Sequence, residues 1–593
     1  MGSVQQIRLS LSSRTSGYCT LPTAHCLLIQ SERIYLQPST LAKRGTVLLF
    51  FVVVAFYFYG LGHLPFVGPD EPRYAQVARE MYLRHDLITP TLGGHTWFEK
   101  PALLYWMMIL SFKLFGVSEW AARLPAALSG VLTVAAVFCI GNRAEGKYAD
   151  GQLPSDRLSL GFWTALAAAT TIGLVAFSRA ASFDILLTMT TTWSLAFYVL
   201  NEWEENTNRR QLFLVGFYSF IGLSLLAKGL VGIVIPVGVV FFYQLFRKRL
   251  PEKNVLVSLF WGAPLALAVA ATWYGPVITR HGWPFIDQFF IQHHFARYIS
   301  NKYHHAQPFY YYLVVLPLLV LPWNAFLFDA FVKARRWPWR AKIITANPVD
   351  DSLRRLLTFA LAWLLFPLLF FSFSNSKLPG YILPVLPAVA LIVGERLWRI
   401  TSDSTAGKWP IKMTGTMCLL VATMAFVYHR NMSNLNIMFV FLIAAPLYLA
   451  GGFALLAPRR TKTSILMFAG ATVMVMIVLL LGAPPAFAEL ESSKRLLQLA
   501  DARGYSQAVI YGMQRSDRTP EFYAAGRVVY GTDGEPIMYE GPAPVIEESR
   551  MRKETVLVFV PVADADLLTG MTSVKTDVIG NNGRYAIVAV SAQ

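Results

Sequence analysis

Runs of about 20 apolar residues recur in this 593-residue chain from about residue 45 to about residue 483, and each is long enough to cross the hydrocarbon core of a bilayer. Only 15% of the residues are charged, against about 25% in soluble proteins. This composition excludes a soluble multidomain enzyme. We predict a polytopic α-helical membrane protein with about 13 transmembrane helices, near 45–63, 120–140, 158–177, 185–200, 211–227, 229–246, 255–276, 309–331, 355–374, 379–397, 411–428, 434–456 and 463–483.

One further apolar stretch, 101–116, is short for a span and is interrupted by Lys113. If this stretch lies along the membrane surface, every basic loop cluster falls on one side of the membrane; if it crosses, Lys43 and Arg44 lie opposite the rest. We therefore predict a juxtamembrane helix in the first outer loop. The resulting division is a cytoplasmic tail (1–44), a transmembrane domain (45–483) and a C-terminal region on the outer side (484–593).

The formal net charge of +17 would suggest nucleic-acid binding in a soluble protein. Here the Lys and Arg residues lie in short loops between apolar runs, where they are typical topology signals. We therefore expect membrane lipids, and no nucleic acid, among the partners of this chain.

The C-terminal region changes character after the last apolar run. Segments typical of strands (AVIYG, RVVYG, TVLVFVP and YAIVAVS) alternate there with segments typical of helices, which predicts a small α/β domain. It contains no Gly-rich phosphate loop, so we expect a structural or acceptor-docking role. None of the four cysteines follows the last apolar run, so no disulfide framework is predicted for this domain.

Two acidic motifs follow apolar runs on the predicted outer face. Asp70 and Glu71 lie beside Arg73 just after the first span, where they could orient a substrate or exchange a proton; an ordinary helix cap is the alternative. Asp184 stands at the head of a span, where a charge is costly and indicates function; the alternative is an N-cap of the helix, favoured by the helix dipole.

Three basic or polar groups occur on the same face. Lys100, within WFEKP, could bind a lipid phosphate as a point charge or only extend towards the headgroups. Lys377 and Tyr381 lie in a very short outer loop. They could bind a lipid phosphate or only anchor the chain at the membrane interface. The histidines near Arg297 form two adjacent pairs but match no strong zinc pattern; a metal held by Glu99 and His305, or no metal at all, both stay open.

Taken together, PDEPRYAQVAREM, FEKPALLYW, the Asp184 turn, HHAQPFYYY and SKLPGYILP, in that order, resemble the bacterial 4-amino-4-deoxy-L-arabinose (aminoarabinose) lipid A transferases. These belong to the protein mannosyltransferase-like membrane glycosyltransferases of the C-class fold. The resemblance covers about residues 45 to 593. It implies an inverting glycosyltransferase in the bacterial inner membrane, with its active site on the periplasmic face. Such an enzyme moves aminoarabinose from undecaprenyl phosphate to lipid A phosphate, which weakens electrostatic attraction of polymyxin and cationic antimicrobial peptides.

The resemblance also implies roles for individual residues. The carrier phosphate would be bound by Lys100 and Tyr381, with Arg73, Arg297 and Lys377 as further candidates, and the two carboxylates at the reacting centre would be Asp70 and Asp184. Aromatic side chains around 97–106 and 309–312 would line a groove for the prenyl tail. No cofactor is required by this reading, a divalent metal stays an alternative, and a monomer is expected.

The motif SKLPGYILP carries Gly380, so no side chain is available from that position. Two rival functions stay open: another polyprenyl-phosphate-sugar transferase, such as a protein O-mannosyltransferase, and a lipid flippase or transporter. The transporter predicts charges in the middle of spans and discontinuous helices, whereas the charges here cluster at one face.

Overall fold

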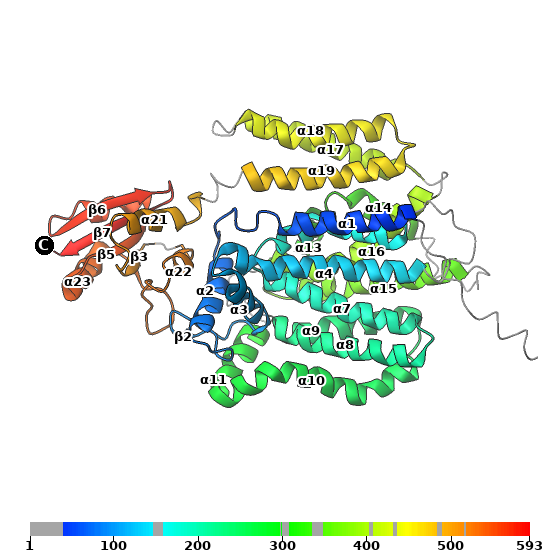
Figure 1. The fold of residues 1–593 in the computed structure, drawn as a ribbon, viewed down its shortest axis with the longest axis horizontal. Coiled ribbons are helices and arrows are strands. Elements are labelled where there is room, and N and C mark those ends of the chain that lie inside the picture. Colours follow the sequence, from blue (N-terminus) through cyan, green and yellow to red (C-terminus); the bar gives the residue numbers. More distant parts are fainter. Residues whose placement is uncertain are drawn as a thin grey trace, which may run out of the picture.

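The computed structural model of the chain describes residues 40–145, 158–296, 298, 307–334, 348–402, 407–430, 436–482, 489–514 and 517–592. These residues form a helical bundle and, at one of its ends, a small domain built on a β-sheet (Figure 1). Most of the predicted tail, up to residue 39, lies outside the described residues.

Nine helices are long and apolar enough to cross a membrane on length and composition alone. They are α4 (Glu119–Glu145), α7 (Phe183–Trp203), α8 (Thr207–Lys228), α10 (Lys253–His281), α15 (Pro348–Ser372), η4 with α16 (Pro379–Val385, Leu386–Ser402), α17 (Trp409–His429), α18 (Ile437–Leu456) and α19 (Thr461–Gly482).

Two of the predicted spans are bent and are not single straight helices. The span predicted at 158–177 consists of α5 (Leu160–Thr170) and α6 (Ile172–Ser178), which meet at 62°, and the span predicted at 309–331 consists of α13 (Tyr311–Val320) and α14 (Asn324–Lys333), which meet at 116°.

Counting each bent pair as one span gives up to 11 in the described part of the chain. Two shorter apolar helices, α1 (Thr40–Phe58) and α9 (Val231–Arg247), occupy the positions of the remaining predicted spans. The polytopic helical fold is thus confirmed.

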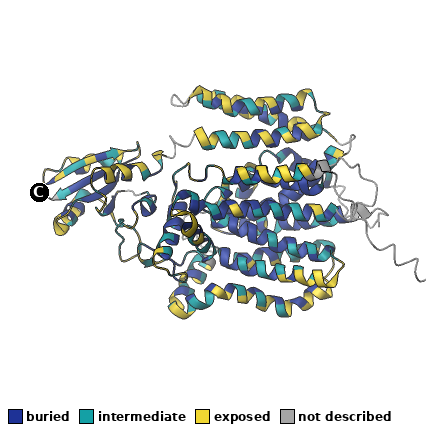
Figure 2. Cartoon of the chain, viewed as in Figure 1, coloured by how far each residue is buried: buried dark blue, intermediate teal, exposed yellow. Residues whose placement is uncertain are grey.

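The centre of the bundle is formed by α4, α7 and α16, whereas α10, α17, α18 and α19 expose most of their surface (Figure 2). Small residues bring the central helices together. A Cβ atom on Gly394 of α16 would overlap the backbone of Thr164 in α5, and a Cβ atom on Gly141 of α4 would lie 3.0 Å from the Cα atom of Gly161 in α5. Close approach at small residues is the usual packing mode of helices in membranes, where apolar burial does not distinguish a neighbouring helix from lipid.

The two ends of the bundle differ. One end, called here the capped end, carries α2 (Asp70–Leu83), the hairpin β1–β2 (Thr91–Leu92, His95–Thr96), α3 (Leu103–Phe115), α11 (Trp283–Ile286) and the π-helical segment η1 (Asp287–Ala296) (Figure 1). The opposite end carries basic residues paired with acids, such as Arg143 with Glu204 and Arg247 with Glu202. Helix α3 is the predicted juxtamembrane helix, and the charge asymmetry agrees with the predicted topology.

The C-terminal domain is a five-stranded mixed sheet in the order β4-β3-β5-β7-β6. Its elements are α21 (Lys494–Ala502), β3 (Ile510–Met513), α22 (Pro520–Tyr523), β4 (Met538–Tyr539), α23 (Pro542–Arg552), β5 (Val556–Pro561), η5 (Val562–Asp564), α24 (Asp566–Thr569), β6 (Val574–Asn581) and β7 (Tyr585–Ala592).

This sheet confirms the predicted α/β domain but not each of its strands. The segment RVVYG contributes only a single parallel bridge from Val528 to Ile510. Strand β4 forms further along the chain, and β6 was not predicted.

The C-terminal domain is docked on the capped end by specific contacts from α21 and α22. The hydroxyl of Tyr523 donates to Glu119 at the start of α4 (3.0 Å) and accepts from the Phe66 amide (2.7 Å). Lys494 donates to the same Glu119 carboxylate (2.5 Å), and the guanidinium of Arg79 lies against the ring of Phe522. The domain is therefore held against the bundle on the side where the predicted site residues lie.

Candidate active site

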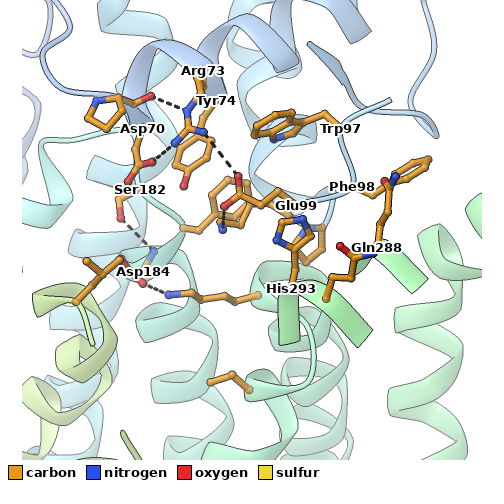
Figure 3. A pocket seen from close by; sticks show the side chains of 18 of the residues that line it. Asp70, Arg73, Tyr74, Trp97, Phe98, Glu99, Ser182, Asp184, Gln288 and His293 are labelled. Carbon is orange, nitrogen blue, oxygen red and sulfur yellow. Dashed lines mark hydrogen bonds and ion pairs between the residues drawn. The ribbon is translucent and has the colours of Figure 1, made fainter. Parts of the chain in front are cut away.

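A cavity of about 1180 Å³ lies at the capped end, between the bundle and the C-terminal domain. Its walls come from α2, the segment that follows the β1–β2 hairpin, the head of α7, the end of α8, the start of α9, η1 and the end of α15 (Figure 3). The turn 532–535 of the C-terminal domain forms part of its rim. Of the residues predicted for the site, Asp70, Arg73, Glu99, Lys100, Asp184 and Tyr381 all line this one cavity.

The neighbouring acids Asp70 and Glu71 have different environments. Glu71 is buried and accepts two hydrogen bonds from Arg123 of α4 (2.9 and 2.8 Å) and one from the Ala181 amide (2.7 Å). It therefore joins α2 to the heads of α4 and α7. The side chain of Asp70 is 56% exposed and pairs with Arg73 one helical turn on (2.8 Å). Of the two, only Asp70 offers a largely accessible carboxylate to the cavity.

Arg73, Glu99 and Lys100 form one charged cluster on the cavity wall (Figure 3). Lys100 donates to Glu99 at 2.6 Å, and Arg73 lies 3.9 Å from the other Glu99 oxygen. Burial by itself raises the pKa of Glu99, but the nearby charges of Lys100, Arg73 and His293 outweigh it and hold that pKa well below its usual range. Glu99 is thus an anion at neutral pH that orients two cations.

Asp184 forms a second charged cluster with Lys228. Ser182, and not Asp184, caps α7, because its hydroxyl accepts from the Asp184 amide (3.1 Å). The Asp184 carboxylate is thereby left to pair with Lys228, whose ammonium also lies 4.6 Å from the centre of the Tyr381 ring. A Cβ atom on Gly380 would overlap the Asp184 carboxylate, so the absence of a side chain at position 380 makes room for this pair.

Lys228 was not predicted, although the sequence contained a signal for it. It stands between the spans predicted at 211–227 and 229–246, and alternation of spans puts that junction on the same face as Asp184. Helix α8 ends at Lys228 because Gly229 takes a positive φ of 69°, which glycine tolerates. The ammonium is thereby placed at the cavity wall.

Other predicted residues do not line the cavity in the described part of the chain. Lys377 is buried, and its ammonium donates to the carbonyls of Gln307 (2.9 Å) and Ser374 (2.6 Å). Arg297 and His305 lie outside the described residues.

No group of three or more His, Cys, Asp or Glu side chains that could hold a metal occurs within the described ranges. The predicted ligand Glu99 is engaged by Lys100.

One wall of the cavity is apolar. Val231 and Val234 of α9 face it, together with Phe370 and Phe371 of α15 and Phe295 of η1. Among the aromatics predicted to line a prenyl groove, Trp97 and Phe98 line the cavity, whereas 309–312 are not part of its lining. The cavity therefore has both charged and apolar walls, as binding of an anionic lipid requires.

Comparison with known proteins agrees with this architecture. The profile of the dolichyl-phosphate-mannose-protein mannosyltransferase family matches residues 99–274. An undecaprenyl phosphate-α-4-amino-4-deoxy-L-arabinose arabinosyl transferase of Aeromonas salmonicida is 29% identical over 63% of this chain and 64% of its own length. The enzyme of that name from Shewanella sediminis is 30% identical over 58% of each chain. The alignments thus span less than two thirds of these two relatives.

Among solved structures, ArnT from Cupriavidus metallidurans bound to undecaprenyl phosphate has a TM-score of 0.73 and 24% identity, covering 92% of this chain and 97% of that one. The fold is therefore shared along nearly the whole chain. These findings confirm the predicted family resemblance.

Proposed function

We propose that this chain, as a relative of the aminoarabinosyl transferases, moves 4-amino-4-deoxy-L-arabinose from undecaprenyl phosphate to a phosphate group of lipid A. The reaction takes place on the periplasmic face of a bacterial inner membrane, and its product gives resistance to polymyxin and other cationic peptides. The observation that carries the proposal is the convergence of three cation–carboxylate contacts, at Arg73, Lys100 and Lys228, in a cavity with an apolar wall.

The two ends of the donor suit the two parts of the cavity. The prenyl tail would lie along the apolar wall formed by α9 and α15, since a lipid tail is excluded from water. Its phosphate would lie next to Lys100 and Arg73, with the Tyr381 hydroxyl as a further donor. Guanidinium groups bind phosphate in a fork geometry and ammonium groups bind it as point charges.

The proposed reaction is a single displacement at the anomeric carbon. An oxygen of the acceptor phosphate forms a bond to that carbon while the bond between it and the carrier phosphate breaks, with inversion. The leaving undecaprenyl phosphate takes the electron pair. The acceptor oxygen is already anionic at neutral pH, so the step needs no strong general base, and catalysis rests on positioning and on charge stabilisation.

The two carboxylates have distinct proposed roles. Asp70, accessible and beside Arg73, would orient the acceptor or pair with the ammonium of the sugar. Asp184 would stabilise positive charge that develops at the sugar ring, with Lys228 holding it in place. The cations supply the charge stabilisation, so the proposal includes no metal, and the enzyme acts as a monomer.

Mass spectrometry of lipid A tests the proposal. A polymyxin-sensitive strain that lacks its own transferase is complemented with the wild-type chain, Lys100→Ala or Lys113→Ala. The matched control, Lys113, is exposed on α3 and lies outside the cavity lining. Aminoarabinose added by the wild type and Lys113→Ala, but not by Lys100→Ala at equal expression, supports the proposal. A well-expressed wild type that leaves lipid A unmodified contradicts it and favours another acceptor or a transporter.

A further inference from the structure

A contact between the C-terminal domain and the β1–β2 hairpin lies close to the cavity but forms no part of the reaction proposed above. Gly93, at the tip of the hairpin, faces the ring of Tyr530, and a Cβ atom at this glycine would overlap the ring atoms Cγ, Cδ2 and Cε2. The neighbouring ring of His95 lies 6.5 Å from that of Tyr530, centre to centre. The hairpin tip therefore fits against Tyr530 only because residue 93 has no side chain.

Glu80 of α2 holds the same hairpin by hydrogen bonds. Its carboxylate accepts hydrogen bonds from the Thr91 hydroxyl (2.7 Å) and from the amides of Gly93 (2.8 Å) and Gly94 (3.3 Å). A carboxylate that accepts several backbone bonds at once fixes the local geometry strongly. The hairpin is thus contacted by both α2 and the C-terminal domain.

The hairpin leads directly into the cavity wall. Its base is closed by the Trp97 amide, which donates to the Pro90 carbonyl (2.9 Å), and every residue from Trp97 to Lys100 lines the cavity. The guanidinium of Arg73 lies 5.5 Å from the Trp97 ring centre. A displacement of the hairpin would therefore be passed to Glu99 and Lys100 through a link of only a few residues.

Tyr530 is itself part of a rigid turn. It forms a bridge with Pro536, the Gly531 amide donates to the Glu535 carbonyl (2.8 Å), and the Gly534 amide donates to Gly531 (3.0 Å). Glu535 also pairs with Arg518 of the same domain. The ring that presses on Gly93 thus has a fixed support.

We propose that Tyr530 is a positioning residue that sets the place of Glu99 and Lys100 through the hairpin 91–96. The C-terminal domain then takes part in organising the phosphate-binding side of the cavity, although Tyr530 lies 430 positions after Lys100 in the chain. The inferred effect of Tyr530 on transfer rests on the proposed function, whereas its inferred effect on the hairpin rests on the contacts alone.

Two neighbouring glycines provide a matched test. Gly93 and Gly94 both have positive φ angles, +59° and +82°, and both donate to Glu80, but nothing lies within 4 Å of a Cβ atom at Gly94. Gly93→Ala and Gly94→Ala share the backbone penalty of alanine at positive φ, so their difference isolates the contact with Tyr530. Tyr530→Phe keeps the ring, and Tyr530→Ala removes it.

The full-length variants are compared in nanodiscs by hydrogen exchange of the peptide 97–102, with β5 as an internal reference, and by kcat for transfer. Gly93→Ala is expected to raise exchange in 97–102 and to lower kcat about 100-fold relative to Gly94→Ala, the size of effect of a small misplacement of catalytic groups. Tyr530→Ala, which removes the support of the hairpin tip, is expected to show the same two effects, and Tyr530→Phe behaves as the wild type.

Equal exchange in 97–102 for the two glycine variants, or wild-type exchange in that peptide of Tyr530→Ala, would overturn the proposal. So would faster exchange in β5 of Gly93→Ala, because the contact would then only support the fold of the domain. A wild type that transfers no aminoarabinose refutes the proposed function separately, and the exchange measurement still decides whether Tyr530 positions the hairpin.

Discussion

Neutralising Glu71 is expected to lower the stability of the protein. Neutralising its neighbour Asp70 is expected to abolish transfer and to leave stability unchanged. Glu71→Gln removes the negative charge that matches Arg123, a residue only 4% exposed, and leaves that guanidinium buried with only neutral acceptors, one amide oxygen and backbone carbonyls. Removing one partner of a buried pair costs about 3–5 kcal/mol. Asp70→Asn disrupts an exposed pair one turn apart on a helix, which is worth about 0–1 kcal/mol.

The two variants are compared by thermal unfolding of the purified protein and by lipid A modification. A loss of at least about 3 kcal/mol corresponds to a fall in apparent Tm of at least about 3 °C for a domain of about 440 residues, and we expect it for Glu71→Gln only. Asp70→Asn should keep the wild-type Tm and lose transfer. A Glu71→Gln protein within about 1 °C of wild type, or an Asp70→Asn protein that unfolds as early as Glu71→Gln, would refute the assignment of structure to one acid and chemistry to the other.

Three further outcomes are expected. Gly380→Ala should abolish lipid A modification because its Cβ overlaps the Asp184 carboxylate, whereas Gly470→Ala, with nothing within 4 Å, should modify lipid A normally. The lowered pKa of Glu99 means that its pair with Lys100 is fully formed above the pKa of an unfolded Glu and is lost only below it. Affinity for the phosphodiester donor, whose phosphate keeps a single charge in this range, should therefore be unchanged between about pH 7 and about pH 5, and a tenfold loss in that interval would count against the pair. EDTA should leave transfer by the purified enzyme unchanged, and inactivation reversed by a divalent ion would place a metal in the reaction.

The location of the site residues at one end of the bundle could be predicted, because it depends only on how successive membrane spans alternate in direction. Apolar runs of membrane length, with basic loops on one side, fix which loops share a face, and Asp70, Lys100, Asp184 and Tyr381 do line one cavity. The direction of a side chain within its loop does not follow from alternation. Lys377 shares that face but gives its ammonium to two backbone carbonyls.

The different roles of Asp70 and Glu71 could not be predicted from the sequence, for a related reason. The partner that buries Glu71 is Arg123, 52 positions away on another helix, and no local pattern links the two. Strand β6 is the opposite case. Its hairpin with β7 turns at Asn582-Gly583, and Asn-Gly is a strong hairpin signal. The alternating segment before this turn is polar, so it was not predicted to be a strand.

The balance of charge in the cavity bears on how such a site could catalyse transfer. Arg73, Lys100 and Lys228 each contact a carboxylate, so the excess positive charge of the chain is not concentrated there. A phosphodiester donor carries a single negative charge, whereas a phosphate monoester approaches two at neutral pH. Attraction to fixed cations therefore grows as the bond to the sugar breaks. Cations whose positions are already set by carboxylates gain most at that point, so the cluster would stabilise the departing carrier more than the bound donor, as an increase in kcat requires.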